Sequence, residues 1–218
     1  LMGVKGMVRP SEIFLGFARY YNTLTIAFEE SLATNTSRII SYMDNLGRML
    51  GYRIFSELTF SKLFDLAGKK CPSELKGKKP DICWGYITED GKFRYELVLE
   101  SEQSMDDEKI KKDMEKLLCF PSQLKVLYCP HNNPKRVIEI AKEVAKKQQK
   151  LTGELLVIID PWVNRKTFSK GKLLGLLLNS NLEWLAVGEA NITTLKEFAH
   201  TIRLFKNATW KTVNEQII

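Results

Sequence analysis

The first quarter of the chain shows the hydrophobic spacing of two helices. In residues 12–32 the apolar side chains recur at intervals of three and four, which predicts an amphipathic helix with Ser11 as its N-terminal cap. A second helix is predicted to begin at Ser37 and to stop at Gly51, since glycine is favoured just past helix ends. The polar stretch 34–37 predicts a break between the two helices.

The apolar pattern then changes to the two-residue period of β-strands. Strands are predicted at residues 52–58, 80–87 and 93–102, and the sequence Glu-Asp-Gly-Lys at 89–92 predicts a hairpin turn between the last two. Residues 61–79 contain many lysines together with glycine and proline, so this segment is expected to be a loop.

Helices and strands alternate in the rest of the chain, with Asn133 as the cap of one helix. The predicted elements are a helix at 106–118, a strand at 124–129, a helix at 134–150, strands at 154–160 and 184–187, and a helix at 195–205. This order predicts an α/β fold in which an antiparallel meander leads into a β-α-β unit. The break at 34–37 divides it into an N-terminal helical extension, residues 1–36, and an α/β domain, residues 37–218.

Composition places the chain among ordinary globular proteins. Of its 218 residues 44% are apolar and 27% are charged, and the net charge is +7. This modest positive surplus favours a polyanionic partner without identifying it. The longest apolar runs, 155–159 and 173–178, are far shorter than the roughly 20 residues of a membrane span, so no membrane partner is expected.

The cysteines and histidines argue against a zinc site, because no two cysteines form a CxxC pair and the two histidines lie far apart. The sequence has no recognisable secretory signal, which predicts a cytoplasmic protein with reduced thiols. It also has no glycine-rich phosphate loop, nucleophile elbow or redox pair, so no organic cofactor is expected.

Three acidic residues of the predicted hairpin carry the main chemical signal. Asp81 opens one strand, and Glu100 and Glu102 lie two positions apart near the end of the next, so they project from one face. Strict alternation also places Glu96 and Val98 on that face. Because Asp81 and Glu100 are each nine or ten residues from the Asp-Gly turn, antiparallel pairing brings both to the same end of the hairpin.

Such a group of carboxylates has a chemical use. The charges repel one another unless a cation neutralises them, and Mg²⁺, with Mn²⁺ as an expected substitute, takes oxygen ligands of this kind. One or two such ions can bind a scissile phosphate, lower the pKa of an attacking water and stabilise the leaving oxygen. The three acids therefore predict phosphodiester hydrolysis.

The segment resembles the PD-(D/E)xK nuclease superfamily, which has the restriction-endonuclease-like fold. The family motif is Pro-Asp on one strand and acid-x-Lys on the next, and Pro80-Asp81 and Glu100 match it. Glu102 stands where the family usually has lysine, although some members carry acid-x-acid there. The resemblance covers roughly residues 37–160, with a core motif region at 51–160. It implies a mixed central β-sheet flanked by helices, with the order helix, three strands, helix, strand.

The resemblance also implies roles for residues outside the motif. Lys109, Lys111 and Lys112 on the following helix are candidates to replace the motif lysine, and Lys111 is favoured because it lies nearest the apolar face of that helix. Glu57 lies near a point where family members often place another glutamate, which makes it a candidate fourth acid.

The activity implied by the resemblance is that of a Mg²⁺-dependent deoxyribonuclease, in particular an endonuclease. Asp81 and Glu100 would be metal ligands, Glu102 a further ligand or the general base, Glu57 a supporting ligand, and Lys111 a catalytic residue. Nucleases of this fold often pair to cut both strands, so a homodimer bound to DNA is expected, with the first helix as a candidate dimer element. A small virus or mobile element would suit such a chain.

Other interpretations stay open at the level of sequence. A DNA-binding or assembly protein could retain the nuclease fold without activity, and the missing motif lysine favours that alternative. In a small-molecule or regulatory α/β protein, Glu100 and Glu102 would simply be the polar end of a strand. The helix at 134–150 could follow a DNA backbone, although its pattern favours a plain amphipathic surface helix, and His131 has no evident partner in the sequence. The lysines before Pro-Asp could contact phosphates or form a solvated loop; they are Lys69, Lys70, Lys76, Lys78 and Lys79.

Overall fold

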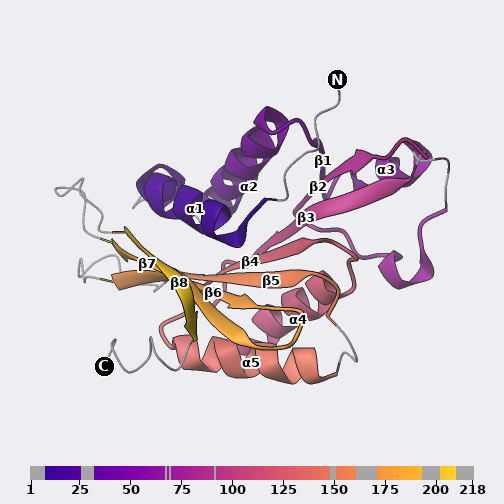
Figure 1. The fold of residues 1–218 in the computed structure, drawn as a ribbon. Coiled ribbons are helices and arrows are strands. Elements are labelled where there is room, and N and C mark those ends of the chain that lie inside the picture. The colour runs from indigo at the N-terminus through magenta and orange to yellow at the C-terminus, as the bar shows by residue number, and fades with distance from the viewer. Residues whose placement is uncertain are drawn as a thin grey trace.

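The protein folds around one eight-stranded sheet in which the strands lie side by side in chain order, from β1 to β8 (Figure 1). This architecture is seen in a computed structural model that describes residues 8–25, 32–66, 68, 70–90, 92–147, 151–160, 171–192 and 202–209. The helices are α1 (Pro10–Thr25), α2 (Leu32–Met49), α3 (Phe60–Leu66), the 3-10 helix η1 (Ser73–Leu75), α4 (Asp107–Leu118) and α5 (Pro134–Lys146). The strands are β1 (Arg53–Ser56), β2 (Ile82–Ile87), β3 (Phe93–Ser101), β4 (Leu124–Pro130), β5 (Glu154–Asp160), β6 (Gly171–Leu178), β7 (Trp184–Ile192) and β8 (Ile202–Thr209).

The sheet is mixed, and its parallel part is at the centre. Strands β1, β2 and β3 form an antiparallel meander, β3, β4 and β5 are parallel, and β6 to β8 are again antiparallel. Helices α4 and α5 make the two crossovers that parallel neighbours require. The predicted α/β fold, with a meander that leads into a β-α-β unit, is therefore confirmed.

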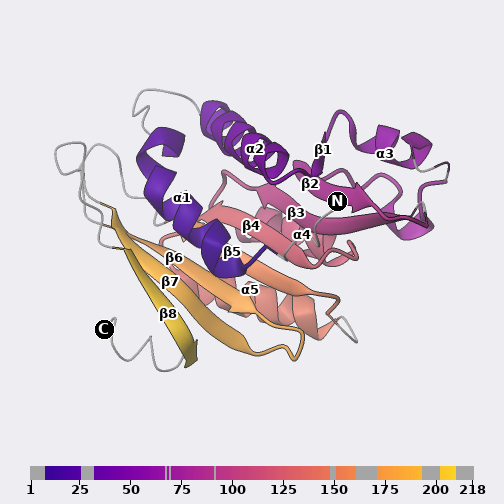
Figure 2. The ribbon, with the colours of Figure 1, turned by 45° about the horizontal axis from the view of Figure 1, so that its top comes forward.

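Helices cover both faces of the sheet, as the two ribbon views show together (Figure 2). On one face α4 and α5 bury residues such as Ile110, Met114 and Val137 against β3, β4 and β5. On the other face α1 and α2 bury Phe14, Phe17 and other apolar residues in a second core. Strands with both sides covered are apolar throughout, which explains the continuous hydrophobic run of β5.

The ends of the first two helices differ from the prediction. Ser11 lies inside α1, and the cap precedes it: the Glu12 carboxylate accepts the Arg9 backbone N–H at 3.1 Å. The predicted break at 34–37 is wrong because α2 begins at Leu32 and runs through it, so the domain boundary drawn at residue 36 falls within a helix. Burial of the apolar stripe that includes Ile39 and Met43 outweighs the low helix propensity of threonine and asparagine.

Helix α1 is packed onto the sheet through two glycines. A Cβ atom on Gly175 of β6 or Gly188 of β7 would lie 2.5 Å from ring atoms of Phe14, which is fully buried. The sequence made this helix a candidate dimer element, but Phe14 and Phe17 of the helix pack in the core of their own chain.

Three further features of the structure differ from the sequence prediction. Residues 61–79 include α3 and η1, because Phe60, Leu63 and Phe64 supply a short helix with a buried side. The predicted last helix at 195–205 is wrong for residues 202–205, which belong to β8, while 193–201 lie outside the described residues. A register shift between Trp84 and Gly85 breaks the strict alternation of β3, so that Tyr95 packs in the same core as Val98.

Candidate active site

The hairpin of β2 and β3 brings Asp81 and Glu100 to the same end of the sheet. Ile82 of β2 pairs with Leu99 of the antiparallel strand β3. Asp81, just before Ile82, and Glu100, just after Leu99, therefore lie next to this pair at the same end of the hairpin. The backbone N–H of Ser101 donates to Asp81 Oδ2 at 2.7 Å, which fixes the aspartate against the end of β3. The predicted meeting of these two acids is therefore confirmed as geometry.

Glu100 is almost fully buried, with an exposed fraction of 2%. Its Oε2 atom lies 2.5 Å from Nζ of Lys116, while Oε1 has no hydrogen-bond partner among the described residues. A buried carboxylate oxygen without a donor is energetically costly, so such an atom calls for an explanation in catalysis or ion binding.

Helix α4 contributes two residues that the sequence did not identify, Asp113 and Lys116. They are three positions apart, so they lie on one side of the helix, and Lys116 Nζ is 3.9 Å from Asp113 Oδ1. The same ammonium donates to the backbone oxygen of Lys79 at 3.3 Å. Lys116 thus joins the end of β3, the segment before Asp81 and α4.

Glu102 and Glu57 lie around this pair. Glu102 is half-buried, and its Oε1 accepts the backbone N–H groups of Gln103 and Ser104 at 2.7 and 2.6 Å. Glu57 is exposed in the turn after β1, close enough to Asp81 for its charge to raise the pKa of that carboxyl. All four predicted acids therefore gather at one end of the meander, with Asp113 as a fifth.

Burial and mutual repulsion raise the pKa values of Glu100 and Asp81. Burial, reinforced by the charge of Asp81, raises the pKa of Glu100 to about 9, although Lys116 opposes the shift. Burial also raises the pKa of Asp81 above its usual value, against the hydrogen bond from Ser101 and the charge of Lys116. A further positive charge nearby would stabilise the ionised forms of both carboxyl groups.

Asp113 and Lys116 are also shifted. Burial is the main reason that the pKa of Asp113 rises to about 6, and the charge and hydrogen bond of Glu102 contribute in the same direction. Burial by itself would lower the pKa of Lys116, but Glu100, Asp113 and Asp81 more than reverse this and raise it. Lys116 is therefore held as a cation among acids.

Lys111, the lysine favoured from the sequence, is not the one that reaches Glu100. Its ammonium is 3.7 Å from Glu143 of α5. The chain after β3 first approaches α5, where Asp107 accepts a hydrogen bond from Arg136 at 2.6 Å, and only the end of α4 returns to β3 and Lys79. The sequence favoured Lys111 because it lies nearest the apolar face of the helix, but that position directs its ammonium toward α5.

His131 has a partner in the structure. Its Nε2 atom lies 3.4 Å from Asp107 Oδ1, and its Nδ1 atom contacts the backbone of Asn133 at the start of α5. These contacts tie the end of β4 to the starts of α4 and α5. They give the histidine a structural role at the same end of the strands as the carboxylates.

The acids can be tested as ligands for the Mg²⁺ ion that the resemblance implies. Within the described part of the chain, no group of three or more His, Cys, Asp or Glu residues could hold a metal ion as it stands. Mg²⁺ sites, however, commonly use one or two carboxylates, with waters and substrate phosphates completing the shell. Asp81 and Glu100 fit that role chemically, since they are adjacent and Glu100 Oε1 has no partner among the described residues.

Comparison of the chain with protein-family models, with curated proteins and with solved structures found no match in any of the three. Among the helices that the structure describes, none is long and apolar enough to cross a membrane.

Proposed function

We propose that the protein is a Mg²⁺-dependent nuclease that hydrolyses phosphodiester bonds of DNA, and that it acts as an endonuclease. The observation that carries the proposal is the pair formed by the buried Glu100 and the half-buried Asp81, with the Lys116 ammonium 2.5 Å from Glu100. A lysine beside two adjacent acids is the set of side chains that the nuclease motif requires. Here the lysine comes from α4 in place of the strand position occupied by Glu102.

The order of elements supports the same proposal. Helix α2 is followed by the meander of β1, β2 and β3, with α3 and η1 inserted between β1 and β2, and then by α4 and by β4 parallel to β3. This is the helix, three-strand, helix, strand order expected of a restriction-endonuclease-like core. Asp81 directly precedes the second strand and Glu100 lies near the end of the third, which is close to the placement that the motif would require.

Each residue has a proposed task. Asp81 and Glu100 would hold Mg²⁺, which when bound supplies positive charge to the scissile phosphate and lowers the pKa of a coordinated water. Lys116 stabilises negative charge on the phosphate oxygens or orients the attacking water. Asp113, with a pKa raised to about 6 by burial and by Glu102, is suited to accept a proton near neutral pH. Glu57 adds negative charge at the exposed side.

A second candidate is a DNA-binding protein that retains this arrangement without activity. The observation that favours it is the contact between Lys116 and Glu100, since the lysine occupies one oxygen of Glu100 without a metal. On this alternative the Lys116 ammonium would take the place of a metal ion at Glu100 and prevent the ion from binding. Binding to DNA would persist and would weaken with added salt, as for any protein that contacts phosphates.

Cleavage of supercoiled plasmid separates the two candidates. Purified protein is incubated with Mg²⁺ or Mn²⁺ beside a variant that combines Asp81→Asn and Glu100→Gln. The matched control is Glu108→Gln, an exposed acid in the first turn of α4. We expect nicked or linear DNA with wild type and control and none with the double variant. Equal cleavage by all three preparations, or binding without cleavage by folded wild type, would reject the nuclease.

A further inference from the structure

A cavity of about 400 Å³ lies between α3 and the segment that leads to Asp81. Its apolar wall is made by Phe60, Phe64 and Leu75, and Lys70, Lys78 and Lys79 also line it. No acidic side chain is among the described residues that line it. An apolar wall with several cations suits a ligand that has a flat apolar part and a negative charge.

The lysines of this cavity are placed differently from one another. Lys70 and Lys79 are exposed, while Lys78 is half-buried and its Nζ lies 2.6 Å from Sγ of Cys119 at the end of α4. The Lys78 side chain is therefore fixed at the cavity wall, while the exposed side chains of Lys70 and Lys79 can move to contact a ligand. The sequence left open whether these lysines contact phosphate or only water; the cavity beside them favours a ligand.

The cavity is next to the candidate active site. Only Pro80 separates Lys79 from Asp81, so their Cα atoms are at most about 7 Å apart. Lys116 Nζ contacts the backbone oxygen of Lys79 at 3.3 Å and Glu100 Oε2 at 2.5 Å. A nucleotide in the cavity would thus have its neighbouring phosphate close to Asp81 and Glu100.

We infer that this cavity binds one unpaired nucleotide of the DNA substrate, with the base against the apolar wall and the adjoining phosphates at Lys70 and Lys79. The inference rests on the proposed function and narrows its substrate to DNA with a single-stranded or extruded nucleotide. Its volume lies near the lower end of small-ligand pockets, roughly 300–1,000 Å³, which fits one nucleotide and excludes a base-paired helix. Base contacts of this kind tolerate any sequence, since every base has an apolar face.

Two kinds of variant distinguish base insertion from simple attraction of phosphate. Ser61 is exposed and lines the cavity, so Ser61→Trp would fill the space without a change of charge. The pair Lys70→Gln and Lys79→Gln removes charge and leaves the space. Lys62, exposed on the same helix and absent from the cavity wall, is the matched lysine control as Lys62→Gln.

Binding of labelled oligothymidylate and of a fully paired DNA hairpin is measured by fluorescence anisotropy in EDTA, with melting curves to verify folding. We expect Ser61→Trp to weaken oligothymidylate binding about tenfold or more and hairpin binding less than about twofold. The lysine pair should weaken both and should lower the salt dependence by about two phosphate contacts, while Lys62→Gln stays within about twofold of wild type. Unchanged oligothymidylate binding by folded Ser61→Trp would overturn the inference.

A footprint on the unmodified protein gives a second test that does not depend on any substitution. Cys71 is exposed and lines the cavity, so a maleimide should modify it, and the modification rate is followed by mass spectrometry of the peptide. We expect oligothymidylate to slow modification at least about fivefold. An unchanged rate at saturating oligothymidylate would also overturn the inference. Both tests omit divalent metal, so they are independent of cleavage. Protection without cleavage would contradict only the proposed nuclease activity. Cleavage without protection would contradict only the inferred role of the cavity.

Discussion

At the scale of single residues, the proposed function depends most on Glu100 and Lys116. Glu100 is buried with one oxygen against an ammonium and the other without a partner among the described residues. A buried carboxyl–ammonium pair of this kind contributes little net stability after the cost of desolvation, so stability alone does not account for it. The two residues come from different elements, so their meeting depends on the whole β3–α4 connection.

The role of Lys116 is tested by comparing it with Lys111. Lys116→Met should lower the single-turnover rate of DNA cleavage by about 100-fold or more, the usual effect of removing one group that stabilises charge in the transition state. Lys111→Met should stay within about threefold of wild type, because that ammonium faces Glu143. The two variants remove the same charge from the same helix. Equal losses in both would assign the effect to general attraction of DNA.

Glu100 should also set how stability varies with pH in the metal-free protein. Its pKa is raised by burial to about 9 in the folded state, against about 4.3 in an unfolded chain. Between these values the folded state binds more protons, so the free energy of unfolding should fall as pH rises toward 9. Asp81 and Asp113 are shifted in the same direction and add to the slope.

The measurement is urea unfolding in EDTA at several pH values between 5 and 9. Glu100→Gln cannot ionise, so its stability should fall less steeply with pH than that of wild type. Glu108→Gln, which changes an exposed acid, should keep the wild-type slope. A Glu100→Gln variant with the full wild-type slope would mean that Glu100 is ionised in the folded protein across this range.

The sequence identified some of these residues and missed others for a physical reason. Asp81 and Glu100 could be predicted to meet because a hairpin turn fixes the register of the strands beside it. Lys116 and Asp113 could not, because the course of a helix over a sheet depends on side-chain packing between α4 and α5. A residue on the last turn of α4 thus reaches Glu100, although Lys111 is nearer in sequence.

At the scale of elements, α1 is the part whose position was hardest to predict. Its amphipathic pattern specified a helix, but nothing in that pattern indicated the strands it would cover. The close approach of Phe14 depends on Gly175 and Gly188, which lie more than 150 residues further along the chain. Helices α4 and α5 were easier, because short crossovers between parallel strands leave few alternatives.

The packing of α1 is tested by Phe14→Ala. Removal of this fully buried ring should lower the free energy of unfolding by about 3–5 kcal/mol, the usual cost for a core phenylalanine. Arg19→Ala, at an exposed position of the same helix, should change it by less than about 0.5 kcal/mol. Urea unfolding of both variants measures this. A small effect of Phe14→Ala would mean that α1 is a detachable extension, as the sequence suggested.

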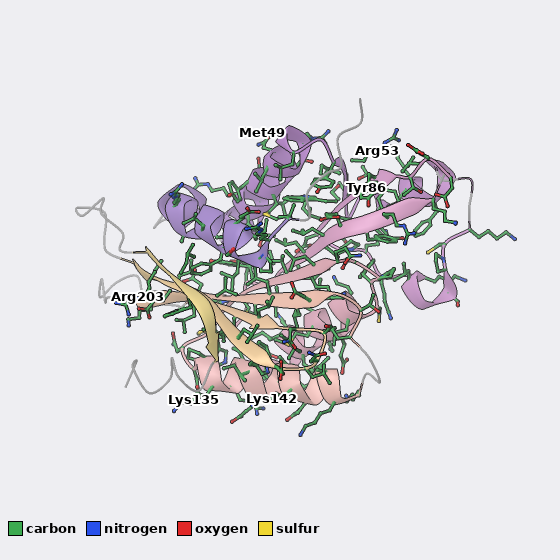
Figure 3. The ribbon with its side chains drawn as sticks, in the orientation of Figure 1. Met49, Arg53, Tyr86, Lys135, Lys142 and Arg203 are labelled. Atoms are coloured by element: carbon green, nitrogen blue, oxygen red, sulfur yellow. The ribbon has the colours of Figure 1, made fainter. Side chains whose placement is uncertain are left out.

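At the scale of the whole molecule, the positive charge of +7 and the acidic site are complementary features. Exposed lysines such as Lys135 and Lys142 project from α5 away from the sheet (Figure 3). On the proposed function, diffuse positive charge would attract DNA without specifying where it is cut, while Asp81 and Glu100 would act on a phosphate delivered to them. The predicted homodimer stays a prediction, and the apolar face of α1 around Phe14 is already used inside the chain.

The separation of binding from cleavage gives a prediction at this scale. The affinity for duplex DNA should fall as salt is raised, with a slope of log K against log salt near −0.9 for each phosphate contacted. Asp81→Asn, with its site acid neutralised, should keep that slope and bind duplex within about threefold of wild type. Fluorescence anisotropy at several salt concentrations measures both quantities. Loss of binding in Asp81→Asn would show that the site acids are needed to hold DNA.

The proposed nuclease activity requires that the acids at the end of the β2–β3 hairpin hydrolyse DNA with the help of a divalent cation. The most direct measurement is the rate of plasmid cleavage in one sample to which EDTA and then excess Mg²⁺ are added, beside Asp81→Asn purified in parallel. We predict that cleavage by wild type stops with EDTA and resumes with Mg²⁺, while Asp81→Asn stays inactive throughout. Cleavage that continues in EDTA, or that is equal in Asp81→Asn, would contradict the account.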